Sequence, residues 1–249
     1  MSSVAIIVPY REQIGQNRKW ELQEFTKYMV KYMNKLVQNE KIKKFHIYII
    51  EQNYGKKFNR GMLLNIGYHL INDLYDIFIF HDIDLLPDKN LRSWYSYKYK
   101  NEDKMNHNPI HIANCWRDRY CGDLYFGGIV LFNKDIFEKI NGFPNIFWGW
   151  GGEDDALYKR CIVNKYKPIK VNYGTIQDIE MDSYGNKMNL DEKLTFLKKN
   201  KEWKCQNKWE CRDEDNINWR SDCLCNINEL YTINDWICSG DYTIISIII

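Results

Sequence analysis

The chain opens with the stretch Val4-Ala5-Ile6-Ile7-Val8-Pro9-Tyr10-Arg11, in which five apolar residues run without interruption up to a proline. A continuous apolar run is typical of a strand that is covered on both faces of a parallel sheet. Apolar residues at helical spacing follow in residues 17–37, and Asn17 is the expected N-cap of that helix. A buried strand followed by a helix is the unit from which parallel sheets are built.

The same alternation continues along the chain. Residues 45–50 and 77–80 predict strands, and residues 58–74 predict the helix between them. Right-handed crossovers of this kind give an α/β fold with a mainly parallel central sheet flanked by helices. Ligands of such sheets bind beyond the carboxyl ends of the strands, so we expect the functional residues at that edge.

Further elements are expected in the rest of the chain. In order, these are a strand at 125–132, a short helix capped by Asn133 that ends at Ile140, a helix that begins with the acids of 153–155 and runs through Cys161, a charged helix after Asn189, a polar stretch rich in Cys and Trp at about 200–225, and two strands at 230–233 and 242–248. No linker and no repeat interrupts this order, so we expect one domain.

Composition narrows the class of protein. The 249 residues are 45% apolar and 15% aromatic, and the formal net charge of +2 argues against a nucleic-acid binder that relies on a basic surface. No stretch has the roughly 18 to 20 apolar residues of a membrane helix, so we expect a soluble, cytoplasmic protein without a transmembrane segment. The eight cysteines leave disulfides and reduced thiols equally open, and their spacing lacks the paired knuckles of a zinc site.

Two acids mark the end of the strand at 77–80. Asp82 and Asp84 are two residues apart, so in an extended segment their carboxylates point to the same side. Such a pair suits a hard divalent cation that is shared with phosphate oxygens. Acidic pairs are also common in solvated turns, and the buried strand directly before this pair brings the two interpretations close to equal weight.

A more specific pattern is Phe147-Trp148-Gly149-Trp150-Gly151-Gly152-Glu153-Asp154-Asp155. The helix dipole alone favours acids in a first turn, but it does not explain the tryptophans and glycines before them. A flexible aromatic loop that delivers carboxylates to a sugar explains both: Trp150 would pack on the sugar, and one carboxylate would act as general base. Arg11 and Arg60 lie where a guanidinium could bind phosphates or uracil, although each alone could be a surface charge.

Six motifs, taken in order, resemble the β-1,4-galactosyltransferase family. They are Ile6-Ile7-Val8-Pro9-Tyr10-Arg11, Phe58-Asn59-Arg60 with Leu63-Leu64-Asn65-Ile66-Gly67, Asp82-Ile83-Asp84, Tyr125-Phe126-Gly127-Gly128, Asn141-Gly142-Phe143-Pro144-Asn145, and Trp148-Gly149-Trp150-Gly151-Gly152-Glu153-Asp154-Asp155. The resemblance extends from residue 4 to about residue 172, and the last two strands resemble the family's C-terminal hairpin. It implies a GT-A-like, Rossmann-like fold and an inverting transfer of galactose from UDP-galactose to a sugar hydroxyl, with Mn²⁺ or Mg²⁺.

The resemblance also implies a role for each matching residue. On the donor side these are Pro9, Tyr10 and Arg11 on UDP, Phe58 and Arg60 on uracil, Asp82, Ile83 and Gly128 beside them, Tyr125 as the residue that selects galactose, and Asp84 as a metal ligand. On the acceptor side they are Trp150 on a moving loop, Gly151, Gly152 and Asp155, with Asp154 as the catalytic base and Glu153 and Asp155 as catalytic residues that position donor and acceptor.

Two departures from the family pattern shape the remaining expectations. The family's metal-binding His is missing from residues 174–185, and we name Asp178 in its place, with Glu180, Met181 and Asp182 as alternatives. The stretch at about 200–225 has no family counterpart. We therefore divide a single transferase domain, 1–249, into a donor and catalytic core, 1–172, and a divergent part, 173–249.

Several alternatives stay open at the level of sequence. The donor could be UDP-N-acetylgalactosamine or UDP-glucose, and the chain could be a glycoside hydrolase or a sugar-binding relative without activity. The acceptor could be a glycan or another glycoconjugate, and the sequence gives no oligomeric state. The resemblance implies a secretory lumen as the alternative to the cytoplasm.

Overall fold

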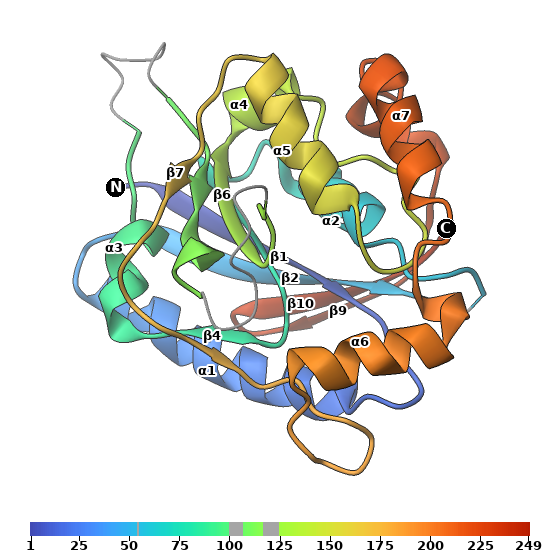
Figure 1. Ribbon diagram of the computed structural model, residues 1–249. Helices are drawn as coiled ribbons and strands as arrows, with labels where there is room; N and C mark the ends of the chain where they lie inside the picture. The colour runs from blue at the N-terminus through green and yellow to red at the C-terminus, as the bar shows by residue number, and fades with distance from the viewer. Residues whose placement is uncertain (54, 100–106, 117–124) are drawn as a thin grey trace.

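The computed structural model describes residues 1–53, 55–99, 107–116 and 125–249. Its centre is an eight-stranded sheet in the order β7-β5-β6-β3-β1-β2-β10-β9, with helices packed on both faces (Figure 1). The strands of this sheet are β1 (Ser3–Tyr10), β2 (Lys44–Gln52), β3 (Ile77–His81), β5 (Ile110–His111), β6 (Ile129–Asn133), β7 (Ile169–Lys170), β9 (Thr232–Ser239) and β10 (Tyr242–Ile248). A two-stranded sheet joins β4 (Leu85–Pro87) to β8 (Ile176–Asp178).

Helices alternate with these strands along the chain. The α-helices are α1 (Arg18–Gln38), α2 (Arg60–Ile71), α3 (Arg92–Tyr95), α4 (Lys134–Lys139), α5 (Glu153–Val163), α6 (Leu190–Lys199) and α7 (Lys208–Asn218). Short 3₁₀ segments are η1 (Lys89–Leu91), η3 (Ile112–Cys115), η4 (Lys201–Trp203) and η5 (Cys223–Glu229). Among the described residues no helix is both long enough and apolar enough to span a membrane.

The predicted α/β fold with a mainly parallel sheet is confirmed. Strand β1 is buried along its whole length and pairs in parallel with β2 and β3, while β10 pairs in parallel with β2. Alternate residues of β1 face two different cores: Ile6 packs in the core under α1, and Ile7 packs in the core with α2. Two covered faces explain why the strand is an uninterrupted apolar run.

Several local predictions differ from the structure. Asn17 stands at the N-cap position of α1 but makes no capping hydrogen bond through its side chain, unlike Asn59 and Asn133. The strand expected at 125–132 begins only at Ile129, because Gly128 has a φ of +73° that no extended strand contains. The predicted helix at 58–74 is shorter, and the strand at 45–50 is longer.

The C-terminal hairpin is present, but its first strand, β9, starts and ends later than the predicted 230–233. The expected helix after Asn189 is α6, and a capping box between Asn189 and Glu192 begins it. The stretch at 200–225, for which no helix was predicted, contains η4 and α7. All the described cysteines are free thiols, and Cys121 lies outside the described residues.

Candidate active site

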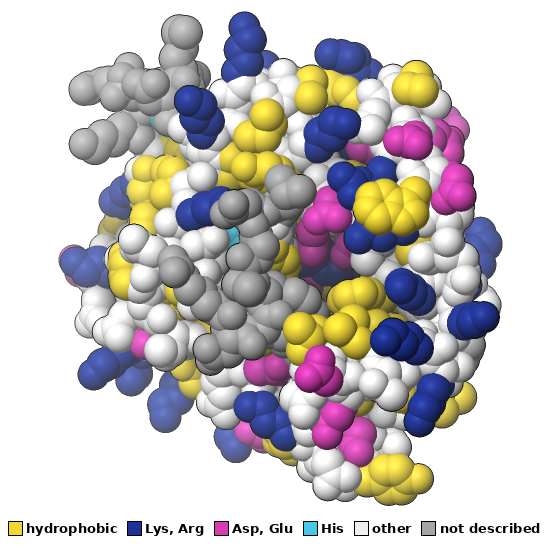
Figure 2. Space-filling view, viewed as in Figure 1, with side chains coloured by type: hydrophobic (Ala, Val, Ile, Leu, Met, Phe, Trp, Pro, Cys, Tyr) yellow, Lys and Arg dark blue, Asp and Glu magenta, His cyan; other side chains and the backbone are white. Residues whose placement is uncertain are grey.

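A cleft of about 520 Å³ opens beyond the carboxyl ends of β1 and β3 and before the N-terminus of α5. In Figure 2 it is a hollow with acidic side chains inside and basic side chains on its rim. Most of the residues predicted for the site line this cleft: Pro9, Arg11, Phe58, Arg60, Asp82, Ile83, Asp84, Tyr125, Gly128, Trp150, Gly151, Gly152, Glu153, Asp154 and Asp155. The two acidic motifs, 70 residues apart in sequence, therefore face one space.

Two predicted site residues do not line the cleft. Tyr10 is buried in the core under α1, and its hydroxyl donates to Glu12. Its side chain points to that core because alternate residues of β1 face opposite sides of the sheet. Asp178 is not among the residues that line the cleft, although one of its carboxylate oxygens lies within 4.8 Å of one from Asp84.

Arg60 connects the two acidic motifs. From the first turn of α2 its Nε donates to Asp82 at 2.7 Å, and its Nη1 donates to Asp154 at 2.8 Å. Glu153 lies 3.7 Å from the same Nη1 atom. Asn59 holds this helix start in place, because its side chain accepts from Met62 N and donates to the carbonyl of Asn145.

Burial and charge act in opposite directions on Asp154. Burial raises the pKa of its carboxyl group well above the usual value, and the positive charge of Arg60 lowers it. Burial likewise raises the pKa of Glu153. Within the described part of the chain, Arg60 is thus the cation that lies within 4 Å of both carboxylates. Its positive charge favours their ionised forms.

Gly127 makes room for Asp154, although it was not predicted as a site residue. A Cβ atom at position 127 would lie 2.0 Å from Oδ2 of Asp154. No side chain can be accommodated at that distance without displacing the carboxylate. The Gly127-Gly128 pair was the available sequence signal, but its meaning depends on this tertiary contact.

The loop before α5 is held against the polar stretch that follows α6. Trp150 N donates to the carbonyl of Trp203 at 2.7 Å, and Cys205 N donates to the carbonyl of Trp150 at 3.1 Å. Gly152, with a φ of +108°, turns the chain into α5. A Cβ on Gly152 would overlap the ring of Phe147, so this turn requires glycine.

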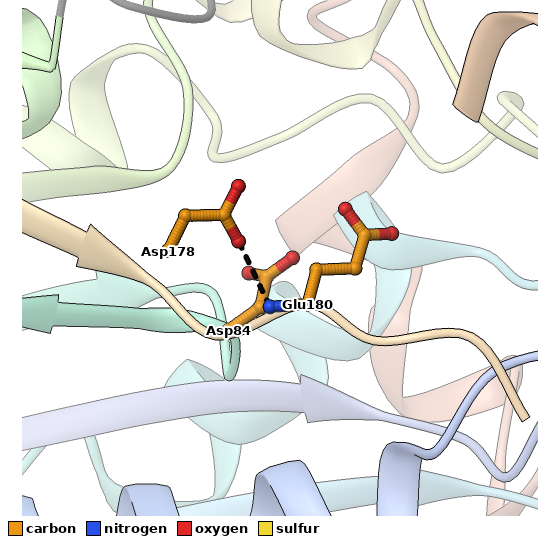
Figure 3. Close-up of side chains that lie close together, drawn as sticks. All are labelled: Asp84, Asp178 and Glu180. Carbon is orange, nitrogen blue, oxygen red and sulfur yellow. Dashed lines mark hydrogen bonds between the residues drawn. The ribbon is translucent and has the colours of Figure 1, made fainter. Parts of the chain in front are cut away.

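Asp84 belongs to a second acidic group, shown in Figure 3. One carboxylate oxygen from each of Asp84, Asp178 and Glu180 lies within 4.8 Å of the others. Asp178, the last residue of β8, accepts a hydrogen bond from Glu180 N at 2.9 Å, which holds the two acids together at the end of that strand. Carboxylate oxygens are the ligands that Mn²⁺ and Mg²⁺ prefer, so this group suits a divalent cation.

Basic side chains accompany these acids. Arg18 Nη1 lies 3.9 Å from Asp84, and Lys193 Nζ lies 2.9 Å from Glu180, whose side chain is fully buried. Burial and the nearby charge of Glu180 raise the pKa of Asp84 to about 7. Three close carboxylates repel one another, and the two cations offset part of that repulsion.

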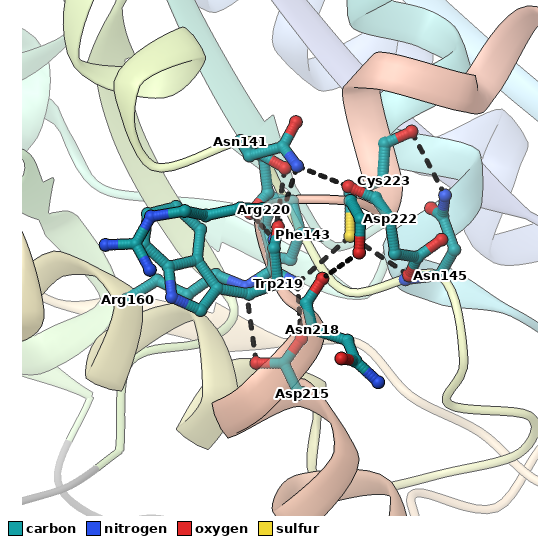
Figure 4. A network of polar contacts seen from close by, with 12 residues as sticks. Asn141, Phe143, Asn145, Arg160, Asp215, Asn218, Trp219, Arg220, Asp222 and Cys223 are labelled. Carbon is teal, nitrogen blue, oxygen red and sulfur yellow. Dashed lines mark hydrogen bonds and ion pairs between the residues drawn. The ribbon is translucent and has the colours of Figure 1, made fainter.

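A polar network away from the cleft fixes the other end of α5 (Figure 4). Arg160, which is only 2% exposed, forms a buried ion pair with Asp215 of α7. The same guanidinium donates to the carbonyls of Asn141 and Gly142 at 3.0 and 2.8 Å. The helix that carries Glu153 and Asp154 is therefore clamped to α7.

Sequence reasoning missed several residues of the cleft, namely Gln13, Gln16, Arg18, Trp116, Met188, Lys193, Phe196, Leu197, Trp203 and Lys208. Six of these ten, from Met188 to Lys208, lie beyond the part of the chain where motifs could be matched. The sequence signals in that part of the chain were the charged segment after Asn189 and the Cys- and Trp-rich stretch at about 200–225.

Two family descriptions match consecutive parts of the chain. The N-terminal region of glycosyl transferase group 7 matches residues 1–97, and the N-terminal domain of galactosyltransferase matches residues 108–182. Human β-1,4-galactosyltransferase 4 is 38% identical over 170 residues, which cover 67% of this chain and 44% of the human protein. The protein of the same name from Cricetulus griseus is 33% identical over 84% of this chain and 57% of its own length. The chain spans about half the length of these relatives.

A solved structure shares the whole architecture. The Drosophila β-1,4-galactosyltransferase 7, solved as a mutant in complex with manganese, UDP-Gal and xylobiose, aligns with a TM-score of 0.74 and 26% identity. The alignment covers 100% of this chain and 94% of the Drosophila chain. A second structure of the same catalytic domain, with xylobiose, has a TM-score of 0.73. Since the matched regions include both acidic motifs that face the cleft, the chain belongs to the β-1,4-galactosyltransferase family.

Proposed function

We propose that this chain transfers galactose from UDP-galactose to a hydroxyl group of a sugar acceptor, with inversion at the anomeric carbon. The observation that carries the proposal is the shared cleft, in which Asp82 and Asp84 face the acidic start of α5. A hydrolase would need two carboxylates around a sugar but would not need an arginine that joins them to a strand-end acidic pair. The names of the relatives and the bound UDP-Gal of the Drosophila structure support the same donor.

The donor would lie along the strand ends. Pro9, Arg11, Phe58 and Arg60 line this side of the cleft, and the guanidinium of Arg11 lies 5.7 Å from the centre of the Phe58 ring. A base that stacks on Phe58 and a diphosphate near the two guanidinium groups would use both kinds of side chain. Tyr125 and Gly128 would contact the sugar ring between the strand ends and α5.

The acids Asp84, Asp178 and Glu180 would hold the cation, Mn²⁺ or Mg²⁺. When bound there, the cation would offset the negative charge that gathers on the diphosphate as UDP leaves. Asp178 and Glu180 together would take the place of the histidine that the family pattern contains and this chain lacks. The oxygen-only set of three carboxylates fits either metal.

Asp154 would act as the general base. The acceptor oxygen forms its bond to C1 of galactose from the face opposite UDP, while the bond between C1 and the β-phosphate oxygen breaks and UDP leaves with the electron pair. The hydroxyl proton moves to a carboxylate oxygen of Asp154. Trp150, Gly151 and Gly152 would bind the acceptor ring, and Glu153 and Asp155 would position the two substrates.

A substrate screen tests this proposal. UDP release is measured for UDP-galactose, UDP-N-acetylgalactosamine and UDP-glucose, each with β-xylosides, β-glucosides and β-N-acetylglucosaminides, with Mn²⁺ and with a chelator. We expect release that depends on UDP-galactose, acceptor and Mn²⁺, together with a β-linked product. Equal release with all three donors would refute the donor assignment, and full activity in chelator would refute the metal role of Asp84.

A further inference from the structure

Helix α7 brings two basic side chains, Lys208 and Arg212, to the acceptor side of the cleft. It lies beside α5, and both helices begin near the cleft: Asp155 in the first turn of α5 faces Lys208 and Arg212, while Arg160 further along pairs with Asp215 (Figure 1). Residues 208–218 lie outside both regions that match the family descriptions. The family descriptions therefore do not include α7, although the Drosophila structure aligns over the whole of this chain.

The two cations at the start of α7 exceed the charge of the acid that they face. Lys208 Nζ lies 3.4 Å and Arg212 Nη1 lies 3.8 Å from the same oxygen, Oδ2 of Asp155. Lys208 lines the cleft, and its Cγ packs 3.1 Å from the place where a Cβ on Gly152 would be. This local cluster therefore holds one positive charge more than negative charge next to the proposed acceptor loop.

An exposed aromatic ring completes this cluster. Trp209 is 67% exposed, and the charged groups of Lys208 and Arg212 lie 5.6 and 5.0 Å from its ring centre. Both contacts are within cation–π distance, so the ring holds the two cations beside one another. Trp209 does not line the cleft itself, but it directly follows Lys208, which does, so its exposed indole offers a flat face to a part of the substrate that extends out of the cleft. Of the other acids of α7, Asp215 pairs with Arg160, whereas Glu210, Asp213 and Glu214 form no ion pair with Lys208 or Arg212 within the described part of the chain.

We propose that Lys208, Trp209 and Arg212 form a subsite for an acidic aglycone, so that the acceptor is a glycoside that carries a carboxylate or sulfate group next to the reacting sugar. This inference rests on the proposed function, since it names the acceptor class of the same site. The acceptor sugar would lie between Trp150 and Asp154, and its anionic group would reach the two cations. Guanidinium and ammonium groups bind such anions through charge-assisted hydrogen bonds.

The test compares two acceptors that differ only in charge. The 4-carboxyphenyl and 4-carbamoylphenyl β-glycosides of the sugar that reacts in the substrate screen are assayed with UDP-galactose and Mn²⁺. We expect the KM of the carboxylate to be about fivefold lower than that of the amide. This preference should weaken as the salt concentration rises, because salt screens exposed charges.

Two variants assign the preference to α7. In K208Q/R212Q the ratio of the two KM values should fall to about one, and in the control K198Q/K199Q, which removes two charges from exposed positions on α6, the ratio should stay at the wild-type value. Equal KM values for both acceptors in the wild type, or an unchanged ratio in K208Q/R212Q, would overturn the subsite. Turnover of UDP-galactose is also measured with and without acceptor, which separates failure of the subsite from failure of the proposed function. No turnover under either condition would refute the proposed function itself.

Discussion

Nη1 of Arg60 lies 2.8 Å from Oδ1 of Asp154, while Nε of the same guanidinium lies 2.7 Å from Asp82. One side chain therefore connects the strand-end acids to the proposed general base. Asp154 is buried, and burial opposes the ionised form that a base requires. The contact with Arg60 favours that ionised form, so it links the donor side of the cleft to the chemistry on the acceptor side.

Replacing Arg60 by Gln should move the acid limb of the pH profile of kcat to higher pH by at least about 1 unit. The physical reason is that loss of the cation raises the pKa of Asp154 further, and a base loses activity as the pH falls through its pKa. Arg11→Gln is the comparison, since Arg11 also lines the cleft but donates to the carbonyl of Lys56. An acid limb that shifts equally in both variants, or in neither, would contradict the role of Arg60.

Replacing Glu180 by Gln should raise the Mn²⁺ concentration needed for half-maximal activity by roughly 10- to 100-fold. The change removes one of the three carboxylates that lie within 4.8 Å of one another. Titration of activity with MnCl₂ measures the effect, and Glu180→His should restore part of the lost affinity because imidazole is also a good ligand. Asp191→Asn, an exposed position on α6, is the control. An E180Q variant with the metal dependence of the wild type would show that Glu180 is not a ligand.

Ala at position 127 should lower kcat by about 100-fold. The new Cβ would be 2.0 Å from Oδ2 of Asp154, so the carboxylate must move out of its place. Gly185→Ala serves as the comparison. It also adds a Cβ to a glycine, at a φ of +82°, but this Cβ would meet no atom within 4 Å. Steady-state kinetics together with thermal unfolding would separate displacement of the base from loss of stability. Unchanged kcat in G127A would mean that the position of Asp154 is not critical.

Replacing Asp215 by Ala should reduce the free energy of unfolding by about 3 to 5 kcal/mol, because it leaves the guanidinium of Arg160 buried without its partner. The double variant R160M/D215A should lose less than D215A, although the carbonyls of Asn141 and Gly142 then lack a donor. Urea unfolding measures both. If the double variant were less stable than D215A, the unpaired charge could not be the cause of the loss.

The sequence predicted the sheet well because its central strands carry the strongest signal a strand can give. Val4 to Val8 are apolar on both faces, and both faces of β1 are covered in the structure. The bounds of an element are harder to predict from sequence when they depend on one backbone angle. The strand expected from Tyr125 begins at Ile129 because Gly128 turns the chain. The pattern of apolar residues does not contain that turn.

The candidate site was predictable where its residues belong to the six motifs that follow the order of the family. The cleft brings together Asp82, Asp84 and the acids at 153–155, as expected for strand ends and a helix start that face one space. The direction of the Tyr10 side chain could not be read from its place beside Pro9. The choice between Asp178 and Glu180 as replacement for the missing histidine was also undecided, and the structure brings both next to Asp84.

The part of the site that α7 contributes had no such motif in the sequence. Helix α7 was expected only as a polar stretch, because its apolar face is interrupted by Arg212 and Asp215. These charges are compatible with a packed helix only because Arg160 and Asp155 lie opposite them on α5. Tertiary pairs of this kind follow from the fold and cannot be read from a single sequence.

The Asp154→Asn variant separates proton transfer from nucleotide binding when galactose transfer is measured by product formation and UDP binding by calorimetry, both with Mn²⁺. If the strand ends hold the nucleotide while Asp154 accepts the proton across the cleft, transfer should fall by about 10²- to 10⁴-fold and UDP affinity should stay within about twofold of the wild type. Transfer at the wild-type rate, or loss of UDP binding together with transfer, would contradict the account.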